Sequence, residues 1–199
     1  QDRFDEAGRR KYAALFAADT LVSEVLYDTE GRVTSRIRYS GAFKTETLYH
    51  LSNGAPSQIT VSENSKRISQ EKYDPAGFLS YVSYYADGKM VSEKFYDAAG
   101  RLTRLILTAG SIKTEILYHL TTGAPSLIII SDNYKKISQD DYYENGLRKS
   151  AVLYSAGVRF SEKFYDSSGR LIRFILTEGG VKTETLYGPD GSVLQVKTY

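Results

Sequence analysis

Residues 96–105 read YDAAGRLTRL, and the same phrase returns as YDTEGRVTSR at 27–36 and as YDSSGRLIRF at 165–174. Its aromatic-Asp-x-x-Gly core is typical of a type I turn. The Asp side chain can accept hydrogen bonds from the backbone that follows it, and Gly can adopt the left-handed conformation that closes a bulged hairpin. The phrase therefore predicts a tight turn between two antiparallel strands.

The turn glycines recur at intervals of 23 residues, with one final interval of 22. They are Gly8, Gly31, Gly54, Gly77, Gly100, Gly123, Gly146, Gly169 and Gly191. A second series lies between them, and most of its members tolerate positive φ. It comprises Gly41, Asn64, Asp87, Gly110, Asn133, Ala156 and Gly179. Two turns in each unit predict one β-hairpin per unit, so the chain is a repeat protein.

Two units carry a longer turn. YHLSNG begins at residue 49 and YHLTTG at residue 118, and each has one extra residue before its glycine. We expect wider loops there, compensated by one residue fewer elsewhere in the unit.

Segments rich in β-branched and aromatic residues lie between the turns, for example 102–108 and 112–119. This composition favours strands, and apolar and polar residues are mixed on both of their faces. Because one short turn joins each segment to the next, the sequence predicts an all-β fold, an extended antiparallel meander of about 17 strands built from 23-residue hairpin repeats. Open sheets of this width curl, so we expect a sheet twisted or coiled into an open shell or solenoid-like form.

The repeat covers residues 1–199 without a linker, which predicts a single hairpin array. A higher period of 69 residues divides it into three-hairpin blocks at 27–95 and 96–164, with a partial block at 165–199. This period fits either a recent duplication or a structural period. Residues 1–20 are the candidate atypical cap, and their Ala-rich part, 9–18, fits either a helix or a blunt capping strand.

Composition excludes several classes of function. The 26 basic and 24 acidic residues are interspersed, giving a net charge of +2 without the basic patch that nucleic acid requires. The absence of cysteine excludes disulfides and zinc-thiolate sites. No apolar run approaches the ~18 residues of a membrane-spanning helix. The chain begins at Gln1 already in phase with the repeat, which fits either a removed signal peptide or a start chosen for expression; we expect an exported, periplasmic or cell-surface location.

No reactive cluster stands out. The two histidines, His50 and His119, occupy equivalent places 69 residues apart, and the third such place is Gly188, which excludes a three-histidine metal site. We interpret them as rings packing beside Tyr49 and Tyr118. No nucleophile elbow, phosphate loop or dinucleotide fingerprint is present. The sequence therefore predicts no enzyme, no catalytic residue, no cofactor and no metal.

An aromatic ring precedes almost every turn glycine. The candidate binding surface is this row: Tyr27, Tyr49, Tyr73, Tyr96, Tyr118, Tyr142, Tyr165 and Tyr187. Flat amphipathic rings suit protein partners and sugar faces alike. The same rings can instead serve only to pin each hairpin by cross-strand packing. Both interpretations stay open at this point.

These phrases carry a family resemblance. YDAAGRLTRL, YDSSGRLIRF and YDTEGRVTSR resemble the YD repeat of Rhs-type bacterial proteins, whose hairpins wind into a large β shell. The 23-residue hairpin, with phrases such as YYADGKM and YYENGLR, is also similar to variant MORN repeats of bacterial surface and envelope proteins. Either resemblance implies an all-β, non-enzymatic scaffold.

We therefore expect an exported bacterial scaffold that mediates structural or protein-protein interaction, with a protein or envelope component as its partner. The alternative is a cell-surface glycan-binding module that uses the tyrosine row. Unpaired terminal strands, such as one formed by 195–199, also make self-association at a sheet edge an option.

Overall fold

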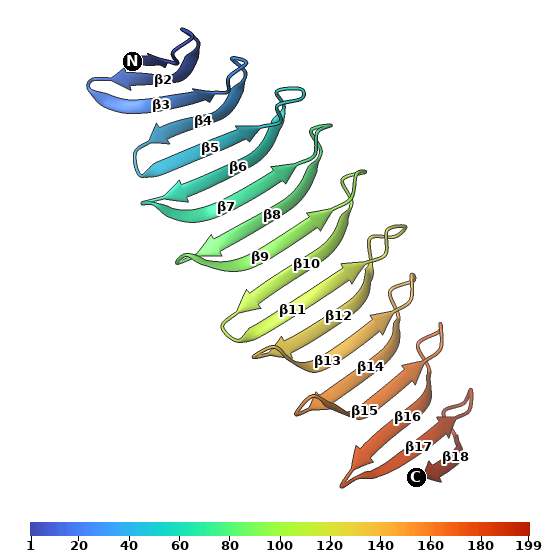
Figure 1. The fold of residues 1–199 in the computed structure, drawn as a ribbon. Helices are drawn as coiled ribbons and strands as arrows, with labels where there is room; N and C mark the ends of the chain where they lie inside the picture. Colours follow the sequence, from blue (N-terminus) through green and yellow to red (C-terminus); the bar gives the residue numbers. More distant parts are fainter. The chain divides into compact units, whose positions relative to one another are not determined.

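The computed structural model describes all residues from Gln1 to Tyr199, and β-strands are its only regular elements (Figure 1). It divides into two compact units, Gln1–Gly100 and Arg101–Tyr199. The predicted all-β antiparallel fold is confirmed, with 18 strands instead of about 17. The single array over residues 1–199 stays a prediction.

The first unit contains β1 (Asp2–Phe4), β2 (Arg10–Ala17), β3 (Thr20–Tyr27), β4 (Val33–Ser40), β5 (Phe43–Tyr49), β6 (Pro56–Glu63), β7 (Lys66–Tyr73), β8 (Leu79–Ala86) and β9 (Lys89–Tyr96). The second unit contains β10 (Leu102–Ala109), β11 (Ile112–Tyr118), β12 (Pro125–Asp132), β13 (Lys135–Tyr142), β14 (Arg148–Ser155), β15 (Val158–Tyr165), β16 (Leu171–Glu178), β17 (Val181–Tyr187) and β18 (Val193–Thr198).

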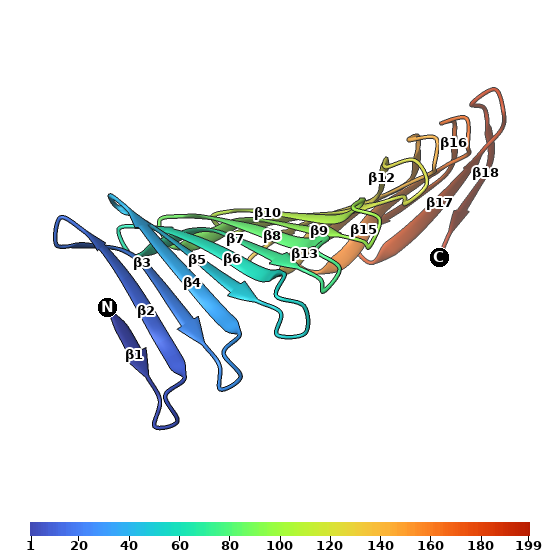
Figure 2. The same cartoon turned by 90° about the horizontal axis from the view of Figure 1, so that it is seen from above.

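Within each unit the strands form an antiparallel meander. From β1 to β9 and from β10 to β18, each strand pairs with the next one along the chain. Strands that are not sequence neighbours within a unit make no contact. Each unit is therefore a single-layer open sheet, and no second layer covers either of its faces (Figure 2).

The Asp-x-x-Gly turns have the predicted geometry. In the turn at Asp166, the amide of Gly169 donates to the Asp166 carbonyl at 2.9 Å. The carboxylate oxygen Oδ1 of Asp166 accepts hydrogen bonds from the backbone amides of Ser168 and Arg170, each at 2.9 Å. All nine turn glycines have φ between 71° and 87°, which a residue with a side chain adopts only at a cost. The carboxylate and the glycine together fix this corner.

The second series of turns is also confirmed. Its seven residues, including Asn133 and Ala156, have φ between 46° and 61°. These residues begin two-residue loops between paired strands, where positive φ matches the twist of the hairpin. The two alternating series of left-handed corners therefore fold the chain back and forth as the spacing predicts.

The extra residue of the longer loops is compensated within the same unit, as expected. The loop after β5 is closed by hydrogen bonds of 2.8 Å from the amide of Gly54 to the carbonyl of His50 and from the amide of His50 to the carbonyl of Ala55. β5 and β11 have seven residues, whereas their partner strands β4 and β10 have eight. The hairpins β4–β5 and β10–β11 also run without a register shift.

The Ala-rich part of the candidate cap forms a strand, β2, and the helix alternative is wrong. Its side chains pair with β3, as in the Ala14–Glu24 pair. A neighbouring strand supplies hydrogen-bonding partners along the segment, and this overrides the helix propensity of alanine.

The two faces of each sheet can be distinguished by register. Every odd-numbered strand from β3 to β17 ends on one of the eight candidate tyrosines. Because side chains alternate along a strand, each tyrosine shares a face with the residues two and four positions before it. We call this the tyrosine face. It includes Arg36 and Arg38 of β4, which pair with Thr47 and Thr45 of β5.

The interior is thin. The buried apolar side chains are Ala14, Val82, Ile106, Val152 and Ile175, and four serines are also buried. These residues come from both faces, which agrees with the mixed alternation of the sequence. The sheet is held by neighbouring side chains on each face rather than by a core between two layers.

Candidate binding surface

The eight tyrosines of the predicted row are all half-buried. Burial, followed by a hydrogen bond from the Tyr73 hydroxyl to the Glu71 carboxylate at 2.5 Å, raises the pKa of Tyr73 to about 12. Burial also raises the pKa of Tyr118. In the first unit, the Arg10 guanidinium lies over the Tyr27 ring at 5.9 Å. Part of each ring packs on the sheet and part is accessible to a ligand, so packing and recognition are compatible.

The two histidines have a structural role in the sheet. Nε2 of His50 lies 3.0 Å from the carbonyl oxygen of Tyr73, and Nε2 of His119 lies 3.1 Å from that of Tyr142. A carbonyl can only accept, so Nε2 carries the proton and donates in both places. Each histidine thus joins its own loop to the next turn. This lateral bond was not predicted from the sequence, although the equivalence of the two positions indicated a structural role.

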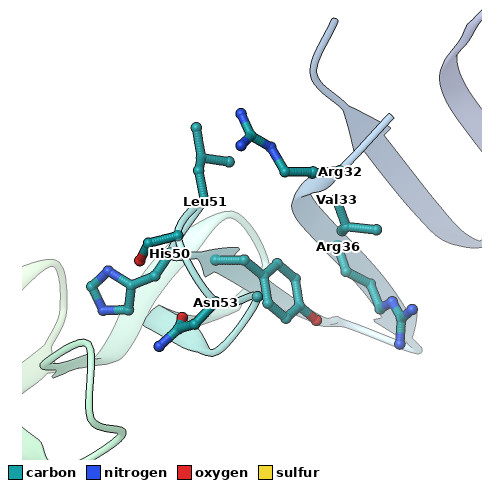
Figure 3. Close-up of a pocket in the computed structure, with 9 residues that line it drawn as sticks. Arg32, Val33, Arg36, His50, Leu51 and Asn53 are labelled. Carbon is teal, nitrogen blue, oxygen red and sulfur yellow. The ribbon is translucent and has the colours of Figure 1, made fainter. Parts of the chain in front are cut away.

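A cavity of about 590 Å³ lies on the first unit between the start of β4 and the loop after β5 (Figure 3). Arg32, Val33 and Arg36 line one side, and His50, Leu51 and Asn53 of the loop lie opposite. The longer loop builds this wall, since its extra residue extends it past the strand end. The loop is further held by the Asn53 side-chain amide, which donates to the carbonyl of Pro75 at 2.5 Å.

A second cavity, of about 200 Å³, lies beside the first on the tyrosine face. The two cavities share Arg36 and Tyr49, and the second also reaches Arg38, Thr45 and Thr47. No aspartate or glutamate lines either cavity. The combined site therefore has guanidinium and hydroxyl donors with no carboxylate among its lining residues.

The arginines of this site differ in their partners. Arg32 is neutralised by Asp28 and Glu30, with nitrogen-oxygen distances of 2.8 Å in both pairs. The hydrogen bond to Asp28 raises the pKa of Arg32. Arg36 is half-buried and Arg38 is exposed, and neither makes an ion pair, a side-chain hydrogen bond or a ring contact.

Every other arginine of the chain has such a partner. The partnered arginines are Arg3, Arg9, Arg10, Arg32, Arg67, Arg101, Arg104, Arg148, Arg159, Arg170 and Arg173. A guanidinium has five donors, so Arg36 and Arg38 keep a full set of donors directed at solvent or a ligand.

These two arginines were missed by the sequence reasoning, which looked for what the repeats share. At the equivalent positions 69 residues later the chain has Leu105 and Leu107. The hairpin geometry is the same in both places, since β4–β5 and β10–β11 have the same register. A comparison of the blocks for their differences would have found Arg36 and Arg38.

No group of three or more His, Cys, Asp or Glu side chains is placed to hold a metal ion. None of the elements is a helix with the length and apolar character needed to cross a membrane.

No protein-family model matches the chain, and no curated protein matches it. Among solved structures, a TarM mutant from S. aureus in complex with fondaparinux, α-GlcNAc-glycerol and UDP is similar at 14% identity and a TM-score of 0.42, over 54% of this chain and 21% of that one. A porin-like protein from Bacteroides uniformis is similar at 9% identity and a TM-score of 0.23, over 99% of this chain and 85% of that one.

Accessory secretory proteins 1, 2 and 3 of Streptococcus pneumoniae are similar at 13% identity and a TM-score of 0.19, over 82% of this chain and 22% of that one. The chain spans about a fifth of the length of the two TarM structures that it matches. All these TM-scores are below 0.5.

Proposed function

We propose that this chain is a non-enzymatic scaffold, exported by a bacterium, that binds a protein partner on its tyrosine face. The observation that carries the proposal is an uncovered sheet face with large apolar side chains. On the tyrosine face of the second unit, Leu107 is 43% exposed, Leu153 is 45% exposed and Val181 is 49% exposed.

The composition of this face supports a protein as the partner. Ile116 of β11 pairs with Ile128 of β12, so the apolar surface continues from the exposed Leu107 across neighbouring strands. Contiguous apolar surface rimmed by polar residues is characteristic of interaction sites. Covering it removes apolar area from water at about 25 cal/mol per Å². A partner that lies on the sheet supplies the second layer that the fold itself lacks.

The proposal is tested by capture from an envelope extract of the source organism, with the purified chain as bait and chemical cross-linking to retain the complex. Leu107→Lys places a charge on the tyrosine face, and Leu26→Lys is the matched control on the opposite face, where Leu26 is 38% exposed. The same partner should be lost with Leu107→Lys and retained with Leu26→Lys. Capture unaffected by Leu107→Lys, or a turnover activity of the isolated chain, would contradict the proposal.

A glycan is the second candidate. The observation in its favour is the recurrence of a half-buried tyrosine at the end of every odd-numbered strand from β3 to β17. A ring with one free face can stack on a sugar. A glycan array distinguishes the two: binding that is lost in Tyr96→Ala and Tyr165→Ala supports the glycan, and an array without signal excludes it.

A further inference from the structure

We infer that Arg36 and Arg38 form a binding site for an extended acidic segment of the protein partner, with carboxylates on alternate residues. This inference rests on the proposed function and names the chemistry of the partner. It starts from the two cavities that share Arg36 and Tyr49, which contain no lining carboxylate.

Arg36 is the arginine of this pair that lies in both cavities. It is half-buried, and its guanidinium, which remains in contact with solvent, has no acceptor in the protein. A hydrogen bond between a guanidinium and a carboxylate is roughly twice as strong as one between neutral groups, so an unpaired arginine favours a carboxylate ligand. All the other arginines of this chain have a partner. An arriving carboxylate would supply the missing acceptor, and it can bind a guanidinium through two parallel hydrogen bonds.

The spacing indicates the form of the ligand. Arg36 and Arg38 are two residues apart on β4, which places their Cα atoms about 7 Å apart on one face. Side chains at alternate positions of an extended peptide have the same spacing. A segment of the Glu-x-Glu type lying along β4 can therefore present one carboxylate to each arginine.

The rest of the lining favours a peptide over a polysaccharide. Thr45, Thr47 and Tyr49 supply hydroxyls beside the arginines, and Pro56 and Ile59 supply apolar contacts. Apolar contacts beside the charged groups suit side chains of a peptide, whereas a polyanionic glycan offers hydroxyls and charges along its whole length. The tyrosine row is represented here by one ring, Tyr49, which lines both cavities.

The chain carries its own control for this site. The β10–β11 hairpin has the same register as β4–β5, and Thr114 corresponds to Thr45. Leu105 and Leu107 occupy the positions of the two arginines. Leucine is therefore compatible with this backbone. The double variant Arg36→Leu/Arg38→Leu should fold, and Leu105→Arg/Leu107→Arg transplants the charged pair to the second unit.

The experiment measures binding of a fluorescent Glu-x-Glu peptide to the full chain by anisotropy at low salt. Arg36→Leu/Arg38→Leu should weaken binding at least about tenfold, since two charge-assisted pairs are lost. Lys66→Leu/Lys89→Leu removes the same charge from two exposed residues elsewhere in the unit and should change affinity less than about twofold. The reverse double variant should add a second binding site, and circular dichroism checks that each variant is folded.

The inference is overturned by no peptide binding by the unaltered chain, by equal weakening by the lysine and arginine double variants, or by tighter binding of a sulfated glycan than of the peptide. A peptide with its glutamates on adjacent residues should bind more weakly than the alternating peptide, and equal binding also counts against the inference. If the arginine double variant still captures the partner from the extract, the acidic-segment inference fails while the proposed scaffold function stands.

Discussion

The hydrogen bond between Tyr39 and Glu24 makes a pH-dependent contribution to the free energy of unfolding, and this contribution can be measured separately. The hydroxyls of Tyr39 and Tyr12 both donate to the Glu24 carboxylate, at 2.5 Å and 2.7 Å. The hydrogen bond to Glu24, together with burial, raises the pKa of Tyr39 from 10.0 to about 12. The two tyrosine hydroxyls lower the pKa of Glu24. Replacing Tyr39 with Phe removes one titrating donor and leaves the ring.

The raised pKa of Tyr39 determines how its contribution to stability changes with pH. The folded pKa of Tyr39 lies above the unfolded value, so its contribution is complete below pH 10 and is lost as the pH rises from 10 toward 12. A shift of two units corresponds to about 2.7 kcal/mol at full strength. Because the pair is only half-buried, solvent screening reduces this to about 1 to 1.5 kcal/mol.

The assay is urea unfolding of the unaltered chain and of Tyr39→Phe at pH 8, 9, 10 and 11. The chain has 17 tyrosines, so only the difference between the two proteins isolates Tyr39. At pH 8 the variant should be less stable by about 1 kcal/mol, and by pH 11 roughly half or more of that deficit should be gone. A deficit that stays constant or grows across this range would refute the reasoning.

Three further changes test other parts of the account. Ala156→Gly should stabilise the chain by about 0.5 to 1 kcal/mol, because Ala156 has a φ of 50° and glycine relieves the left-handed strain at some cost in unfolded-state entropy. A loss of stability in thermal unfolding would contradict a strained left-handed conformation at this turn. Val82→Ala should destabilise by about 1 to 3 kcal/mol in urea because Val82 is buried to 4% exposure, and a neutral result would show that the thin interior contributes little. Asp166→Asn should lower stability at neutral pH, because hydrogen bonds from the backbone and the side chain of Arg170 lower the pKa of Asp166. The deficit should shrink as the pH falls below 3.8. A deficit that stays unchanged in acid would show that the Asp166 carboxylate does not stabilise the turn.

The corners could be predicted because they depend on local chemistry. Gly100 needs a positive φ, and the carboxylate of an aspartate such as Asp166 bonds only to residues two and four positions later, so a short phrase contains the whole turn. The meander follows from the turns. The sequence left a helix and a strand open for residues 10–17 because alanine favours helix, and pairing with β1 and β3 decides for the strand.

The candidate site was only partly predictable. Tyr49 was found because it repeats, but Arg36 and Arg38 break the repeat and were lost in the search for similarity. Their lack of partners depends on which face each side chain takes, and the mixed alternation of the sequence does not distinguish the two faces. The bonds from His50 and His119 to the next turn join residues 23 positions apart, and these depend on the three-dimensional placement of the loops.

The most direct test of an open tyrosine face uses the absence of cysteine, since single thiols can be introduced without interference. Thr47→Cys lies on the tyrosine face, and Thr60→Cys lies on the opposite face of the same sheet. In the isolated chain both thiols should react with a maleimide at comparable rates, and the acidic peptide should slow only Thr47→Cys. A protected Thr47→Cys in the isolated chain, or equal slowing at both positions, would contradict the account.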